Sequence, residues 1–348
     1  KAPIMEAQII EAALLNIINH QSLIATKAAR VVWAAGGDPI MEFGLRRAQG
    51  PDAGTYGARA AIIGGCAGTS NVLTGKMFGV PILGTHAHSW VMSFPSEIEA
   101  FRHYAKTFPD ACTFLVDTYD TLRSGVPNAI KVFQEMKDAG IELKNYGIRL
   151  DSGDLAYLSK KARKMLDEAG FTDAKITASS DLDEYLIMSL KLQGAKINNW
   201  GVGTKLITSD DCPSFGGVYK LAAESDENGN FIPKIKLSNN PSKVTNPGIK
   251  KVLRFYDKAT GKIKADLICL DDEVYSEDKK VKLFDHTAVW KKMVLHPGEY
   301  SIRELLVPLF INGECVYNSP CVTDIRAYCQ KELNTLWDEH RRLANPHN

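Results

Sequence analysis

The chain has 348 residues, and its 42 basic side chains nearly balance its 41 acidic ones. This balance argues against a broad nucleic-acid-binding or anionic-membrane surface, although it is compatible with one basic pocket. The seven cysteines form no Cys-x-x-Cys pair, so we expect a reduced, cytoplasmic protein without a disulfide framework. Polar residues interrupt the longest apolar stretches, so we expect no membrane span.

Helical spacing of apolar residues opens the chain. From residue 4 to residue 33, apolar side chains recur every three or four positions, and Gly36 and Gly37 end the predicted helix. The chain starts at Lys1, close to this helix. We expect an upstream segment that is missing here.

A strand followed by a helix is the unit that repeats through the next part of the chain. Apolar runs end in polar clusters, and predict strands at 81–85, 113–116, 146–150, 175–178 and 199–202. Amphipathic patterns predict helices at 96–106, 128–139, 155–169 and 183–192. The alternation indicates a parallel sheet with right-handed crossovers, and its length favours a barrel.

After Gly216 the pattern becomes rich in short strands. The predicted strands are 218–223, 231–237, 252–255 and 263–269, and a final helix is predicted at 324–343. We therefore expect residues 1–215 to form a helical lead-in and an α/β barrel that carries the active site. Residues 216–348 are expected to form a smaller β-rich domain with the carboxy-terminal helix.

Polar clusters follow the predicted barrel strands, where parallel barrels bind their ligands. The clusters are Thr85–His88, Asp117–Thr118, Asp151–Asp154, Ser179–Asp181 and Gly203–Lys205. Their convergence predicts one active site. For Asp154 and Asp181, a simple helix-capping role is equally compatible with the sequence.

Several residues indicate a phosphorylated substrate. The Gly201–Lys205 segment offers backbone N–H groups and a cation to an anion, but lacks the Gly spacing of a dinucleotide fold. Arg46 and Arg47 form a cationic pair among Gly and apolar residues. Arg149 lies within a predicted strand, on the same face as Asp151, and a buried Arg requires an anion.

The His86-Ala87-His88 segment is open to two interpretations. One is a metal-binding pair of a barrel metallohydrolase, which would need further His or Asp ligands at other strand ends. The remaining histidines do not fall at predicted strand ends. The other is a single histidine that acts as nucleophile or general base.

Long ordered motifs extend over nearly the whole chain. They include Phe43–Gly50, Gly68–Val72, Gly84–Trp90, Arg149–Leu155, Ala178–Asp181, Gly201–Lys205, Gly216–Leu221 and Ile302–Leu306. In these motifs the chain resembles the nicotinate phosphoribosyltransferase family.

The resemblance implies a type II phosphoribosyltransferase fold, which is an irregular α/β barrel with a smaller β-rich sandwich domain. It implies a homodimer with shared active sites, and an amino-terminal segment, absent here, that brings an aromatic residue across the dimer. It implies that nicotinate and 5-phosphoribosyl 1-pyrophosphate give nicotinate mononucleotide and pyrophosphate in NAD salvage. Coupled ATP hydrolysis would pass through a phosphohistidine, which motif position assigns to His88, since His86 stands where the family varies.

We assign roles to the remaining site residues by their chemistry and motif position. Asp151 is expected to act in catalysis, at the ribose hydroxyls or as a ligand of Mg²⁺, with Asp117 and Asp181 supporting it. The nicotinate carboxylate is assigned to Arg46 and Arg149, with Arg47 as a possible partner. The expected 5′-phosphate site comprises Gly201, Gly203, Thr204 and Lys205. Further substrate-binding residues are expected to be Ser70, Asn71, Thr85 and Ser180.

Three alternatives stay open at this point. A nicotinamide phosphoribosyltransferase would share the barrel, although an Asp in place of Asn71 would suit an amide better. A barrel metallohydrolase would contain bound metal. A catalytically silent binding or regulatory fragment would show no turnover.

Overall fold

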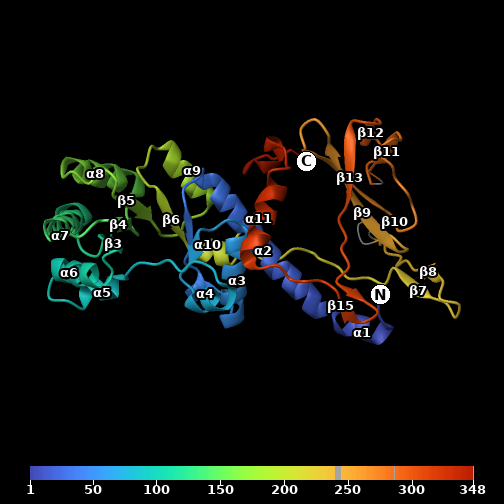
Figure 1. Ribbon diagram of the computed structural model, residues 1–348, viewed down its shortest axis with the longest axis horizontal. Helices are drawn as coiled ribbons and strands as arrows, with labels where there is room; N and C mark the ends of the chain where they lie inside the picture. Colours follow the sequence, from blue (N-terminus) through green and yellow to red (C-terminus); the bar gives the residue numbers. More distant parts are fainter. Residues whose placement is uncertain (240–243, 286, 348) are drawn as a thin grey trace. The chain divides into compact units, whose positions relative to one another are not determined.

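The computed structural model describes residues 1–239, 244–285 and 287–347, which form two compact units (Figure 1). The larger unit comprises Asn16–Gly216 and Cys321–Cys329, and the smaller comprises Lys1–Leu15, Gly217–Pro320 and Gln330–Asn348. This division differs from the predicted one at the two ends of the chain. Residues 321–329 group with the larger unit because Val322 packs into its core and Arg326 donates to the Gly65 carbonyl at 3.0 Å. The first residues group with the smaller unit, where the Lys1 ammonium lies 4.7 Å from the Phe231 ring centroid.

The predicted first helix is two helices, α1 (Ile4–Ile9) and α2 (Glu11–Ala35). The buried residues of α2 lie in its second half and begin at Ile24. Gly36 and Gly37 follow the helix with φ values of 60° and 100°. This left-handed backbone suits glycine and ends the helix where the sequence predicted.

A parallel sheet forms the centre of the larger unit. Its strands are β1 (Ile40–Glu42), β2 (Gly68–Thr69), β3 (Ala111–Leu115), β4 (Asn145–Leu150), β5 (Lys175–Ala178) and β6 (Asn199–Val202). Their order is β2-β1-β6-β5-β4-β3, and each neighbouring pair is parallel. The sheet curls into a half-barrel, which confirms the predicted α/β class. The strand predicted at 81–85 is wrong in extent, since only Ile82 forms a bridge, to Thr69.

Helices cover the outer side of this sheet, with α6, α7 and α8 beside β3, β4 and β5 (Figure 1). The helices are α3 (Pro51–Ile63), α4 (Val72–Phe78), α5 (His88–Met92), α6 (Glu97–Thr107), α7 (Val126–Asp138), α8 (Leu155–Glu168), α9 (Glu184–Leu192) and α10 (Thr204–Ile207). The aromatic core joins helix to strand. The Phe114 ring of β3 lies 4.6 Å from Phe101 of α6 and 5.1 Å from Phe133 of α7, between ring centroids.

A buried ion-pair cluster ties α2 to α9 within the larger unit. Lys27 Nζ lies 2.8 Å from both Glu184 Oε2 and Asp211 Oδ1, and Arg30 Nε donates to Glu184 Oε1 at 2.8 Å. Burial alone would lower the pKa of Lys27, but hydrogen bonds to Asp211 and Glu184 raise it. Glu184 is 0% exposed and pairs with both cations, so its loss would leave the buried Lys27 ammonium with one carboxylate fewer and would destabilise the larger unit.

The smaller unit is built from antiparallel strands. They are β7 (Ala223–Ser225), β8 (Phe231–Pro233), β9 (Lys250–Asp257), β10 (Ile263–Leu270), β11 (Val281–Phe284), β12 (Lys292–Leu295), β13 (Tyr300–Glu304), β14 (Phe310–Ile311) and β15 (Glu314–Cys315). The β10-β9-β13 sheet carries its own apolar core, which confirms the predicted β-rich character. The last α-helix, α11 (Val322–Leu333), is shorter than predicted; it ends at Leu333, and a 3₁₀ turn follows at Asp338–Arg341.

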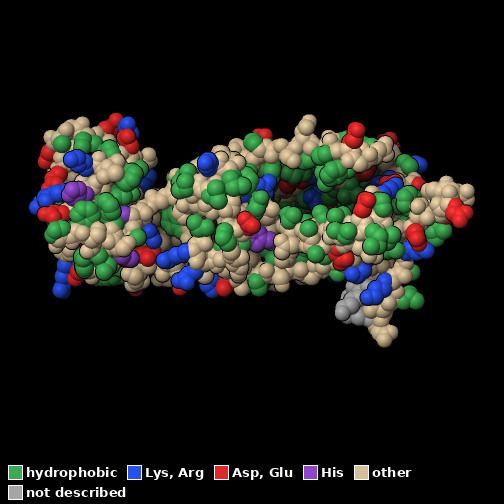
Figure 2. All heavy atoms as spheres, turned by 90° about the horizontal axis from the view of Figure 1, so that it is seen from below, with side chains coloured by type: hydrophobic (Ala, Val, Ile, Leu, Met, Phe, Trp, Pro, Cys, Tyr) green, Lys and Arg blue, Asp and Glu red, His purple; other side chains and the backbone are tan. Residues whose placement is uncertain are grey.

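Basic and acidic side chains are interspersed on the face seen in Figure 2, as the balanced composition predicts. All seven cysteines are free thiols. Among the described residues, none of the helices has the length and apolar character needed to cross a bilayer.

Candidate active site

Arg149 organises the carboxyl ends of three elements in the larger unit. Near the end of β4, its guanidinium donates from Nε to Ser179 Oγ at 2.7 Å, and from Nη1 to Thr85 Oγ1 at 2.8 Å. Its Nη2 donates to Asp151 Oδ1 at 2.9 Å. The requirement of this Arg for an anion is therefore met partly by Asp151, two residues along the chain.

Asp151 lies at the meeting point of these groups. Its Oδ1 accepts hydrogen bonds from Arg149 and from the Ser179 hydroxyl. Burial alone would raise the pKa of Asp151, but the hydrogen bond from Ser179 and the charge of Arg149 lower it below its ordinary value. The group is therefore a carboxylate at neutral pH, with its second oxygen, Oδ2, directed toward His88 at 3.7 Å.

A second carboxylate, Asp117, supports the first. Its Oδ2 accepts from the Asp151 backbone N–H at 3.0 Å and from Ser152 Oγ at 2.6 Å. Its side chain is 2% exposed, and within the described residues its Oδ1 accepts no hydrogen bond. Because buried polar atoms are nearly always satisfied, this oxygen is a candidate for contact with a bound group.

The two histidines of the His86–His88 segment have different surroundings. His86 is buried against Phe101, Tyr104 and Phe114, and its Nε2 accepts the Leu115 backbone N–H at 3.1 Å. Burial lowers the pKa of His86 to about 4, so the ring stays neutral and keeps this acceptor. His86 is thus a core residue.

His88 has the opposite character. Its side chain is 40% exposed, its Nδ1 lies 3.0 Å from Thr118 Oγ1, and its Nε2 faces Asp151 and, at 4.0 Å, Asp117 Oδ1. One hydroxyl therefore orients an accessible imidazole, and two carboxylates face it. The geometry fits a reacting histidine at this position.

Beside this cluster lies a pocket of about 200 Å³. It is lined by Phe43, Arg46, Arg47, Arg149, Asp151, Ser179, Ser180, Asp181, Gly201, Gly203 and Thr204. Three arginines and two carboxylates thus meet in one small polar cavity at the strand ends. Such a cavity suits a small anion joined to a group that develops positive charge.

The backbone around this pocket is tightly constrained. A Cβ on Gly201 would lie 2.5 Å from Phe43 Cε2, and one on Gly203 would lie 3.2 Å from the Phe43 carbonyl oxygen. Ser180 has a backbone φ of 119°, a conformation that residues other than glycine rarely adopt. Strained backbone of this kind is typical of binding sites, and here it lies between two pocket residues, Ser179 and Asp181.

Six residues with sequence-based site assignments lie outside this pocket lining. His88, Thr85 and Asp117 belong to the cluster beside the pocket, whereas Lys205, Asn71 and Ser70 have other contacts. Lys205 Nζ pairs with Asp210 Oδ2 at 2.7 Å. Asn71 is 3% exposed and caps α4, since its Oδ1 accepts the Thr74 N–H at 3.3 Å. Ser70 donates its backbone N–H to the Glu42 carbonyl at 3.0 Å. The capping interpretation does hold for Asp154, which caps α8 through the Tyr157 N–H at 2.9 Å, whereas Asp181 lines the pocket.

Phe43, Ser179 and Thr118 have site contacts that the sequence did not assign to them. The Phe43 ring centroid lies 5.6 Å from Arg149 Cζ, Ser179 joins Arg149 to Asp151, and Thr118 contacts His88. Ser179 and Thr118 belong to predicted strand-end clusters, so the sequence did place them near the site. For Phe43, the only indication in the sequence was its place in the Phe43–Gly50 motif.

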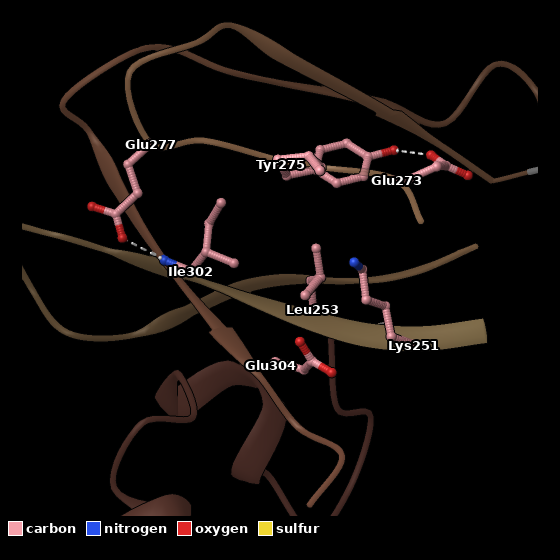
Figure 3. Close-up of a pocket in the computed structure, with 8 residues that line it drawn as sticks. Lys251, Leu253, Glu273, Tyr275, Glu277, Ile302 and Glu304 are labelled. Atoms are coloured by element: carbon pink, nitrogen blue, oxygen red, sulfur yellow. Dashed lines mark hydrogen bonds between the residues drawn. The ribbon is translucent and has the colours of Figure 1, made fainter. Parts of the chain in front are cut away.

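A larger pocket, of about 360 Å³, lies in the smaller unit (Figure 3). Two of its three acidic groups bond to neighbouring residues: Tyr275 donates its hydroxyl to Glu273, and Glu277 accepts the Ile302 N–H. Glu277 also pairs with Lys258 at 2.8 Å. These contacts give Glu273 and Glu277 structural roles within the β-rich unit.

The curled parallel sheet, with this arginine-lined pocket at its strand ends, defines a protein of the type II phosphoribosyltransferase fold. The solved structure of human nicotinic acid phosphoribosyltransferase is similar to it, with a TM-score of 0.82 and 28% identity over 100% of this chain and 75% of that one. The structure of nicotinate-nucleotide pyrophosphorylase from Pyrococcus furiosus shares the fold, with a TM-score of 0.69 over 94% of this chain and 73% of that one, at 24% identity.

The chain belongs to the nicotinate phosphoribosyltransferase family, a family of enzymes. The family model described as "Nicotinate phosphoribosyltransferase (NAPRTase) family" matches residues 39–214, and its C-terminal domain model matches residues 249–348. The nicotinate phosphoribosyltransferase of Bacillus subtilis is 53% identical over 348 residues, which cover 99% of this chain and 69% of the relative. The human nicotinate phosphoribosyltransferase is 31% identical over 398 residues, which cover 99% of this chain and 72% of the relative.

Proposed function

We propose that the chain joins nicotinate to 5-phosphoribosyl 1-pyrophosphate, giving nicotinate mononucleotide and pyrophosphate, as a step of NAD salvage. The observation that carries this proposal is the pocket in which Arg46, Arg47 and Arg149 meet the Asp151 carboxylate. Its size and charge suit a pyridine carboxylate beside a phosphorylated ribose.

The three arginines would together bind the nicotinate carboxylate. Arg149 already donates to Ser179, Thr85 and Asp151, and so is held rigidly with its remaining N–H groups available to substrate. Arg46 and Arg47 line the same pocket from the 3₁₀ turn at Leu45–Arg47. Bidentate pairing of a guanidinium with the nicotinate carboxylate would fix the ring and direct its nitrogen toward the ribose.

Bond formation needs no general base because the pyridine nitrogen already carries a lone pair. The ribose carbon that it attacks develops positive charge, as in other glycosyl transfers. Asp151, held as a carboxylate by Ser179 and Arg149, would stabilise that charge and contact the ribose hydroxyls. Asp117 holds the Asp151 backbone in place, and Asp181 also lines the pocket.

The 5′-phosphate is assigned to the segment from Gly201 to Thr204. Gly201, Gly203 and Thr204 line the pocket, and backbone N–H groups here are suited to an anion. The ammonium of Lys205 is paired with Asp210, so its contribution would require that pair to open. Thr85 and Ser180 complete the expected substrate contacts.

The carboxylates fit a Mg²⁺ ion that is shared with substrate. Among the described residues, no three His, Cys, Asp or Glu groups are placed to hold a metal by themselves. Mg²⁺ is usually bound through one or two carboxylates together with substrate phosphates and water, and Asp151 with the unsatisfied Oδ1 of Asp117 would provide them. When bound, the ion would neutralise charge on the departing pyrophosphate.

ATP is proposed as a co-substrate that phosphorylates His88. A ring nitrogen would attack the γ-phosphate and ADP would leave, and later hydrolysis of the phosphohistidine would restore the imidazole. The added negative charge would lie beside Asp151 and Asp117, where it would alter affinity for pyrophosphate-bearing ligands.

The proposal extends to the oligomeric state and the cellular location of the enzyme. We propose a homodimer with shared active sites, in which a further segment brings an aromatic residue to the pyridine ring. The free cysteines are compatible with the cytoplasm.

Arg149→Lys is expected to lower kcat/KM for nicotinate by about 10- to 100-fold, although the charge is kept, because Lys cannot reproduce the three-way fork. Steady-state kinetics with nicotinate varied would measure the effect. Arg163→Lys is the matched control, since Arg163 also donates through Nε, Nη1 and Nη2, to Asp167, Ala174 and Phe171. Equal kinetic effects of the two substitutions would contradict the assignment.

A further inference from the structure

Glu42 is a buried acidic residue next to a residue of the pocket lining. Glu42, the last residue of β1, is 0% exposed, and its neighbour Phe43 lines the pocket. Both of its carboxylate oxygens accept hydrogen bonds, Oε1 from the Gly44 backbone N–H and Oε2 from Thr69 Oγ1 at 2.5 Å. A fully buried carboxylate is costly in free energy, and neutral donors offset that cost only in part.

The hydrogen bond from Gly44 to Glu42 connects Glu42 to the turn that carries the two arginines. The Gly44 carbonyl accepts the Arg47 backbone N–H at 2.8 Å, which closes the 3₁₀ turn that carries Arg46 and Arg47. Gly44 has no space for a side chain: a Cβ there would lie 2.3 Å from Ile207 Cβ and 2.8 Å from Glu42 Oε1. The first residue of the turn is therefore held by the hydrogen bond to Glu42 and packs against Ile207.

The hydrogen bond from Thr69 connects Glu42 to a second turn, Thr69–Asn71. The Thr69 hydroxyl donates to Glu42 and accepts the Asn71 backbone N–H at 3.0 Å, and the Glu42 carbonyl accepts the Ser70 N–H at 3.0 Å. Asn71 in turn caps α4. One side chain therefore ties together the Gly44–Arg47 turn and the Thr69–Asn71 turn.

We propose that Glu42 is a positioning residue for nicotinate: its carboxylate, acting through Gly44 and Thr69, sets the turn that presents Arg46 and Arg47 to the pocket. This inference rests on the proposed function of the pocket. It assigns Glu42 no contact with substrate. Its role is to fix the separation of the guanidinium groups and their angle to the pyridine carboxylate, because bidentate pairing tolerates little misplacement.

The test uses substitutions at both ends of the Glu42–Thr69 contact, in the full chain. Thr69→Val keeps the shape of the side chain but removes the hydroxyl, and Glu42→Gln replaces one acceptor with a donor. Thr69→Ser keeps the hydroxyl. Glu184→Gln is the matched control, because Glu184 is also 0% exposed but belongs to the Lys27 and Arg30 cluster.

Thr69→Val and Glu42→Gln are expected to raise the KM for nicotinate about tenfold, with kcat and the KM for phosphoribosyl pyrophosphate changed by less than about threefold. Thr69→Ser should stay within about twofold of the unmodified protein in each constant. Glu184→Gln should lower the melting temperature and leave the KM for nicotinate unchanged.

Amide hydrogen exchange in the absence of substrate separates this inference from the proposed function. Faster exchange at residues 43–47 and 69–74 in Thr69→Val, with none in Thr69→Ser, would support the role of Glu42 even if the protein did not turn over nicotinate. Lower melting temperatures without a change in nicotinate KM or in exchange at these turns would overturn it. A Thr69→Ser protein as impaired as Thr69→Val would also overturn it.

Discussion

His88→Ala is expected to reduce incorporation of the γ-phosphate of ATP into the protein to background. His88 is the histidine of its segment whose ring is accessible; its Nδ1 contacts Thr118, and its Nε2 faces the Asp117 and Asp151 carboxylates. Transfer of the ribosyl group without ATP should persist in part, because the arginines and Asp151 remain. Incubation with γ-labelled ATP and counting of acid-labile label on the protein measures the effect.

The control for this experiment is a substitution at His86. Alanine would be a poor choice, since His86 is packed among aromatic rings and its loss would leave the Leu115 N–H unsatisfied, at a cost of about 1–3 kcal/mol for that group alone. His86→Gln offers the N–H an acceptor and should keep phosphorylation. Label retained in His88→Ala but lost in folded His86→Gln would reverse the assignment, and label retained in both would refute a phosphohistidine in this segment.

Asp151→Asn is expected to lower kcat by about 100-fold or more, with a smaller effect on the KM values. The amide keeps the size of the side chain but removes the negative charge that Ser179 and Arg149 stabilise. Charge at this position should matter most when the ribose carbon becomes positive, so the loss falls on the chemical step. Single-turnover formation of nicotinate mononucleotide measures that step.

Asp154→Asn is the control for that substitution. Asp154 caps α8 through the Tyr157 N–H, and asparagine caps helices as well as aspartate does. This variant should keep both its melting temperature and its kcat. An Asp151→Asn enzyme whose kcat is unchanged while only its KM rises would exclude a transition-state role for Asp151.

The strand and helix alternation was predictable because its signals are local. Strands β5 and β6 have the predicted bounds, and α8 begins at Leu155 as predicted, since an apolar run, a capping Asp154 and an amphipathic helix follow in order. Polar residues after such strands must meet at one edge of a parallel sheet. This topology brings Arg149, Asp151 and Ser179 together.

Features that depend on distant contacts could not be predicted in this way. Strand β1 has only three residues and β2 two, too few for a periodic signal. Glu42 has an ionisable side chain of a type that is usually exposed, and only the fold shows that it is buried. Likewise, the packing of His86 against Phe101 and Tyr104 depends on neighbours brought together by the fold.

The most direct test of the central claim is product analysis of the purified full chain. The protein would be given phosphoribosyl pyrophosphate, Mg²⁺ and ATP with either nicotinate or nicotinamide, and the products measured by mass spectrometry. We predict nicotinate mononucleotide from nicotinate and little or no product from nicotinamide, because Arg46, Arg47 and Arg149 present cations to the pyridine substituent. Product from nicotinamide alone, or from neither pyridine, would contradict the account.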